Sequence, residues 1–149
     1  MSGKPWPSGA AARPREREQN EAIAMAKIEV RPVDSGVAAV RGKDDQGAMA
    51  WWKERFGMIA AIPTEHARAG ALLPQLRELS RLPEAERRRM TKIRMQAFLA
   101  LPGDQRQLVM SARKLTYAFD PDLVKSDDEL IKQLAPEVPG AADITKQLD

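Results

Sequence analysis

The side chains that could perform acid–base or metal chemistry are few in this sequence. It contains one histidine, His66, and no cysteine. His66 follows Thr64 and Glu65 in what we predict to be the first turn of a helix, where a cation is disfavoured and the ring should be exposed. One histidine without any thiolate cannot form the multi-histidine or cysteine sites that hold zinc or iron–sulfur clusters. We therefore expect no metal site and no cofactor.

The carboxylates stand mostly where a helix is predicted to begin. Glu84 and Glu86 follow Pro83, where negative charge already interacts favourably with the helix dipole. One spacing superficially resembles a calcium loop, but it lacks the required glycine and contains a proline; its oxygen-bearing residues are Asp120, Asp122, Ser126 and Asp128. The sequence also has no glycine-rich phosphate loop, nucleophile elbow or His-Glu-x-x-His motif. These observations favour a protein that is not an enzyme.

Basic side chains are the strongest candidate for nucleic-acid contact, because arginine and lysine neutralise phosphates. Residues 61–117 carry 11 basic and five acidic side chains, whereas residues 118–149 carry three basic and eight acidic ones. The candidate contacts are Arg87, Arg88, Arg89, Lys92, Arg94, Arg106 and Arg113. Successive helix positions point about 100° apart, so these side chains would not form one uninterrupted basic face. The simpler interpretation is that these basic side chains lie on solvated helix faces beside neighbouring glutamates.

Tryptophan gives the best indication of a surface that binds another protein. Adjacent helical residues point about 100° apart, so only one of Trp51 and Trp52 can lie centrally on the apolar face. Trp52 in the core with Trp51 at its margin is the more common outcome. In the N-terminal region Trp6, between two prolines, and a strip of aliphatic residues could anchor to a partner. The candidate partner-binding residues are Trp6, Ile28, Val30, Val33, Trp51 and Trp52.

Three regions are expected along the 149 residues. Residues 1–47 should form an extended arm and linker, because the first 20 residues are rich in proline and glycine and bury little. The part from Ile28 to Val33 suits an extended segment or a weak hairpin with Val37 to Val40. A helical domain should follow over residues 48–135, and residues 136–149 should form an acidic tail that could add one last turn.

The expected fold is all-α, a small bundle of four to six short helices that are punctuated by prolines. From Ala48 onward apolar residues recur at three- and four-residue spacings, as on one face of a helix. Pro83 and Pro102 should each open a helix, and Pro74 should break or restart one. After an interruption at residues 120–122, the Ser126-x-x-Glu129 capping box should start the last long helix.

A repeated frame with an offset of 19 residues links two of these helices. Leu82-Pro83 matches Leu101-Pro102, Arg87 matches Arg106, and Arg94 matches Arg113. Leucine would close one helix, proline would start the next, and the two arginines would fall two turns apart on one side. The frame describes helical hairpins; two copies are too few for a solenoid.

The sequence thus favours a non-enzymatic accessory or regulatory subunit that docks on a larger protein assembly through its N-terminal arm. We expect a cytoplasmic protein, because no apolar run is long enough to span a bilayer and no signal peptide is evident. A basic helical module that binds nucleic acid is the leading alternative. A helical ligand carrier with a pocket lined by Met90, Met95 and Met110 is a third possibility, although methionines at helical spacing usually fill a core.

Overall fold

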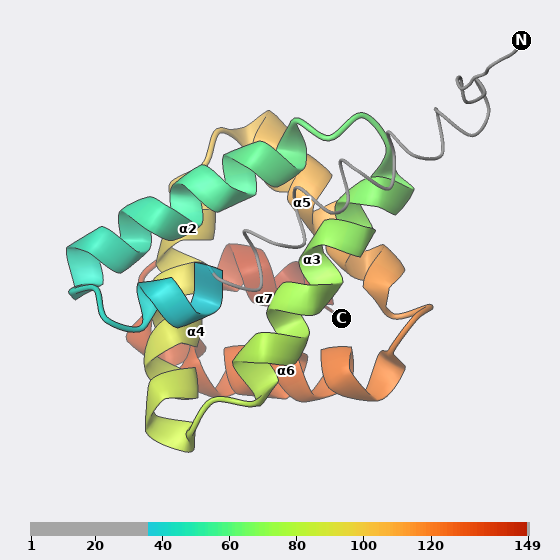
Figure 1. The fold of residues 1–149 in the computed structure, drawn as a ribbon. Helices are drawn as coiled ribbons and strands as arrows, with labels where there is room; N and C mark the ends of the chain where they lie inside the picture. Colours follow the sequence, from blue (N-terminus) through green and yellow to red (C-terminus); the bar gives the residue numbers. More distant parts are fainter. Residues whose placement is uncertain (1–35, 149) are drawn as a thin grey trace, which may run out of the picture.

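The computed structural model describes residues 36–148, and within this range every regular element is a helix (Figure 1). The predicted all-α fold of short, proline-punctuated helices is confirmed. After a helical stretch at residues 36–40, the elements are α2 (Asp45–Ala60), α3 (Glu65–Ser80), α4 (Glu84–Leu99), α5 (Gly103–Thr116), α6 (Pro121–Leu134), the short 3-10 helix η1 (Ala135–Glu137) and α7 (Ala142–Leu148). None of the described helices is long and apolar enough to cross a membrane.

The helices pack as two main pairs, and helix α6 packs against one helix of each pair. Helix α2 packs mainly on α4 and α3 mainly on α5, while α6 contacts both α3 and α4. Figure 1 shows α2 and α6 on opposite sides of the bundle, with α3 running between them. The core between the pairs contains Trp52, Phe56, Leu79, Ile93 and Phe98. This arrangement places α4, α5 and α6 around a common interior region.

The Leu-Pro steps of the repeated frame work as predicted. Leu82 and Leu101 are buried at the ends of α3 and α4, and Pro83 and Pro102 directly precede the first residues of the next helices. Proline suits this position because its missing N–H is one that a helix start leaves unpaired anyway. The frame therefore sets two tight turns in succession.

Pro74 does not break a helix, contrary to the prediction. It lies inside α3, which continues without interruption from Glu65 to Ser80. Leu72 before it and Leu76 after it are both buried in the domain. Packing on both sides of the proline thus outweighs the loss of one backbone hydrogen bond.

The segment from Val37 to Val40 is helical, so its prediction as part of a weak hairpin is wrong. Both valines are buried, at 2% and 0% exposure, because their three-residue spacing brings them to one side of a helical turn. Arg41 then forms an ion pair with Glu86 at 2.7 Å. Residues 36–47 therefore pack with the helical domain, whereas Trp6, Ile28, Val30 and Val33 lie outside the described residues.

The C-terminal part of the chain also packs on the domain. Helix α6 begins at Pro121, with Asp120 as its N-cap, so residues 120–122 start this helix and do not interrupt it. The side chain of Asp120 accepts a hydrogen bond from the backbone N–H of Leu123, as N-cap residues do. In the acidic segment Val138, Ala141 and Ile144 are buried.

Candidate functional site

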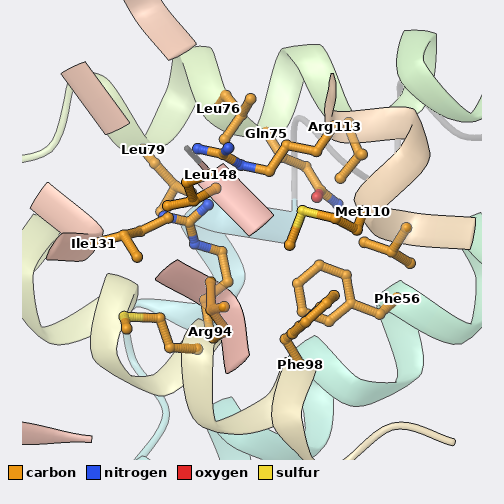
Figure 2. Close-up of a pocket in the computed structure, with 14 residues that line it drawn as sticks. Phe56, Gln75, Leu76, Leu79, Arg94, Phe98, Met110, Arg113, Ile131 and Leu148 are labelled. Carbon is orange, nitrogen blue, oxygen red and sulfur yellow. The ribbon is translucent and has the colours of Figure 1, made fainter. Parts of the chain in front are cut away.

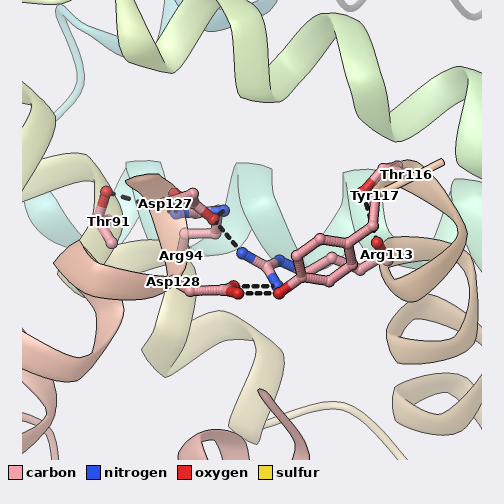
Figure 3. A network of polar contacts seen from close by, with 7 residues as sticks. All are labelled: Thr91, Arg94, Arg113, Thr116, Tyr117, Asp127 and Asp128. Carbon is pink, nitrogen blue, oxygen red and sulfur yellow. Dashed lines mark hydrogen bonds and ion pairs between the residues drawn. The ribbon is translucent and has the colours of Figure 1, made fainter. Parts of the chain in front are cut away.

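Two arginines of the repeated frame meet at one carboxylate inside the bundle (Figure 3). Arg94 of α4 donates two hydrogen bonds to Asp127 of α6, at 2.6 and 3.2 Å. Arg113 of α5 donates to Oδ2 of the same carboxylate, at 2.6 Å. The exposed fractions of the three side chains are only 8–10%. Asp127 therefore joins three helices through charge-assisted hydrogen bonds, which are stronger than neutral ones.

The network continues from Arg113 to a second carboxylate. Arg113 Nη1 lies 2.6 Å from Asp128 Oδ1, and the hydroxyl of Tyr117 donates to Asp128 Oδ2. On the α4 side, Thr91 Oγ1 accepts a hydrogen bond of 3.4 Å from Arg94. Two guanidinium groups thus face two carboxylates, so the formal charges within the network balance.

The arginines hold Asp127 in its charged form. Burial by itself would raise the pKa of Asp127, but the charges and hydrogen bonds of Arg94 and Arg113 outweigh it and lower this pKa from 3.8 to about 2. Burial likewise opposes the charge on Arg113, but Asp127 and Asp128 outweigh it and raise the pKa of Arg113. A carboxylate held ionised and fully engaged in this way is not poised to exchange a proton near neutral pH.

A small cavity of about 40 Å³ lies beside the network (Figure 2). Its walls come from α2 to α7 and are mainly apolar; they include Phe56, Leu76, Phe98, Met110, Ile131 and Leu148. Gln75, Arg94 and Arg113 supply the polar part of the lining and extend into it from three helices. The Nε2 of Gln75 and the Nε atoms of both arginines are buried and have no hydrogen-bond partner among residues 36–148. Buried polar groups are normally paired, so these three N–H donors require an explanation.

The remaining candidate nucleic-acid contacts do not form one basic face. Arg87 donates to the carbonyl oxygen of Leu82 at 3.1 Å, and Arg88 donates to Gln133 at 3.3 Å. Arg89 pairs with Asp45 at 2.8 Å. Lys92 pairs with Glu137 at 3.0 Å, which brings the acidic C-terminal segment against the basic helix α4. Arg106 is half-buried and lines a separate, shallow hollow between the start of α5 and α7.

The tryptophan pair divides between core and surface. Trp52 is fully buried and stacks edge-on against Trp51 and at a tilt against Phe56, so it is not available to a partner. Trp51 is half-buried, and the guanidinium of Arg55 lies 4.9 Å from its ring centre. A Cβ atom on Gly36 would lie 2.3 Å from the Trp51 ring, so the chain passes directly against this ring. Only Trp51 of the pair remains a candidate contact.

The structure also shows where the remaining candidate side chains for chemistry lie. His66 is exposed, as predicted, and its ring packs edge-on against Phe119 at 5.4 Å. Phe119 is 46% exposed and lies in the turn between α5 and α6. Between residues 36 and 148 no group of three or more histidines, cysteines or carboxylates is arranged to hold a metal ion.

Sequence reasoning missed the two central residues of this region, Asp127 and Gln75. Asp127 looked like one of several acidic residues at a helix start, and Gln75 follows a proline that was expected to break or restart a helix. The offset of 19 residues was a usable signal, because it relates Arg94 to Arg113 and these side chains share one acceptor. Met95 and Met110 line the cavity, whereas Met90, the third methionine of the predicted pocket, does not.

Comparison of this chain with protein-family models, with curated proteins and with solved structures gives no match. The geometry of its own residues therefore carries the functional argument.

Proposed function

We propose that this protein is a non-enzymatic accessory or regulatory subunit that docks on a larger protein assembly through its N-terminal segment. Because residues 36–47 pack with the helical domain, the proposed docking segment is residues 1–35. Trp6 and the aliphatic strip Ile28, Val30 and Val33 remain its predicted anchors. A cytoplasmic location belongs to the same proposal.

The observation that carries the proposal is the position of Trp51. This half-buried ring lies where the proposed docking segment joins the domain, in contact distance of Gly36. Tryptophan is enriched at the centres of protein interfaces, because it buries a large apolar area with few rotatable bonds. A partner that binds residues 1–35 could therefore extend its contact onto the domain through Trp51.

The state of the ionisable groups supports a binding role over a catalytic one. The buried carboxylates Asp127 and Asp128 are engaged by arginines and a tyrosine, so the most enclosed charged groups already have structural partners. His66, a residue type often used as a general base, lies on the surface against an aromatic ring.

Affinity purification tests the proposal with the intact chain and with a chain that begins at Gly36. The intact chain should recover a defined set of partner proteins that the shortened chain loses. A Trp51→Ala variant should weaken the recovery, whereas Met58→Ala, which removes an exposed apolar side chain from the same helix, should not. Equal recovery by the intact and shortened chains would show that the segment does not dock.

The internal pairing of the basic residues counts against the nucleic-acid alternative. Arg94 and Arg113 are buried, and Arg87, Arg88, Arg89 and Lys92 have acceptors within the chain. We expect no retention on immobilised DNA at low salt. Retention that is lost steeply with added salt and is reduced by Arg88→Ala and Arg106→Ala would replace the docking proposal with this alternative.

A further inference from the structure

Three buried N–H groups beside the arginine–aspartate network need an acceptor. They belong to Gln75 Nε2, Arg94 Nε and Arg113 Nε, and none has a hydrogen-bond partner in the part of the chain that the structure describes, residues 36–148. Gln75 is only 1% exposed and each arginine only 7%. Because a buried donor without an acceptor destabilises a fold, an accepting oxygen is expected next to these atoms.

The side chains around the cavity cannot supply this oxygen themselves. Arg94 donates from both Nη atoms to Asp127, and the two Nη atoms of Arg113 engage Asp127 and Asp128. Turning either guanidinium to pair its Nε would break one of these charge-assisted hydrogen bonds. Apart from the two arginines and Gln75 the lining side chains are apolar, and the Oε1 of Gln75 cannot serve the Nε2 of its own amide. The acceptor must therefore be a molecule inside the cavity.

The size and the charge of the surroundings select water as this molecule. The cavity has a volume of about 40 Å³, and one water molecule takes about 30 Å³ in the liquid, so there is room for one or two. Sites for organic ligands are usually about 300–1,000 Å³. An anion is disfavoured as well, because Asp127 and Asp128 already neutralise Arg94 and Arg113 and no further cation lines the cavity. Water carries no charge and accepts hydrogen bonds from buried donors.

We propose that this cavity holds one or two ordered water molecules, which accept hydrogen bonds from the Gln75 amide and from the arginine Nε groups (Figure 2). The direct contacts of the network join α4, α5 and α6, whereas Gln75 lies on α3. The bound water therefore extends the polar network to a fourth helix. This water site is separate from the Trp51 region and does not depend on the docking proposal.

Two NMR measurements on the intact chain test the proposal. Cross-relaxation between water and the side-chain amide protons of Gln75 has opposite signs in laboratory-frame and rotating-frame spectra only when the water stays bound far longer than surface water. Oxygen-17 relaxation dispersion counts such long-lived waters and does not detect hydroxyl protons of the protein. Gln75→Met removes the amide while keeping the length of the side chain, and Gln107→Met makes the same change at an exposed position of α5. Thermal unfolding of both variants checks that the fold is retained.

We expect the opposite signs at the amide of Gln75 and not at that of Gln107, which is exposed. Gln75→Met should lower the oxygen-17 dispersion amplitude by the contribution of about one or two waters, while Gln107→Met should leave it unchanged. Three results would overturn the assignment: no long-lived water signal at Gln75, equal amplitudes for the natural protein and Gln75→Met, or uptake of xenon beside Met110 in the natural protein, because xenon enters cavities that are dry.

Discussion

Replacing Asp127 with asparagine tests the role of the shared carboxylate in stability. The variant keeps the size of the side chain but removes the charge that Arg94 and Arg113 contact at 2.6 Å. Breaking a buried ion pair at one partner costs about 3–5 kcal/mol, because the remaining charge is left without compensation. Arg113 still has Asp128, so we expect a loss near the lower limit, about 3 kcal/mol in the free energy of unfolding.

The pH dependence gives a second, independent magnitude. The pKa of Asp127 falls from 3.8 to about 2 on folding, which corresponds to about 2 kcal/mol of stability from its ionised form. Because the folded-state pKa is the lower one, this contribution is complete well above pH 3.8 and is lost as the pH falls through about 2. Asp127→Asn should lack this part of the acid sensitivity.

Urea unfolding between pH 7 and pH 2, followed by tryptophan fluorescence, measures both effects. The difference in stability between the natural protein and Asp127→Asn should be about 3 kcal/mol at neutral pH and should shrink by about 2 kcal/mol towards pH 2. Asp122→Asn, at an exposed position in the first turn of the same helix, should cost less than about 1 kcal/mol. Equal midpoints at pH 7, or a difference that stays constant down to pH 2, would refute the reasoning.

Three further substitutions test the local packing, each by urea unfolding. Gly36→Ala should destabilise the protein by about 1–2 kcal/mol, because its Cβ would lie 2.3 Å from the Trp51 ring. The Cβ in the control Gly42→Ala meets nothing within 4 Å, so this variant should be nearly neutral, and equal effects of the two would contradict the contact. Pro74→Ala should stabilise α3 by about 1 kcal/mol or more by restoring a backbone hydrogen bond, and a loss of stability would show that the ring packs favourably. Arg87→Ala should cost about 1 kcal/mol, because its guanidinium donates to the carbonyl oxygens of Ser80 and Leu82 at the end of α3; an unchanged midpoint would show that water replaces it.

Local sequence signals were sufficient to predict a helix boundary where that boundary depends only on neighbouring residues. The Leu-Pro steps before α4 and α5 predicted two turns, because proline at a helix start depends only on its neighbours. The same reasoning failed at Pro74, since α3 continues through it by burying leucines on both sides. It also failed at residues 36–40, where two buried valines are too few to show a helical period.

The candidate site was less predictable than the fold, because its residues come from distant parts of the chain. Residues 61–117 and 118–149 carry opposite net charges and can attract each other, but composition alone does not say which side chains meet. The meeting of Arg94 and Arg113 at Asp127 depends on how α4, α5 and α6 pack. The cavity depends on the same packing and has no signature in the sequence.

The carboxylate that α4 and α5 share also fixes the alignment of α6 along its neighbours. Sliding α6 by one turn would move Asp127 about 5.4 Å, well beyond the reach of a hydrogen bond. Both guanidinium groups would then lose this counterion in an interior that is mostly apolar. Misaligned arrangements of these helices are thereby penalised, so that one register is selected from several that the leucine and isoleucine contacts alone would tolerate.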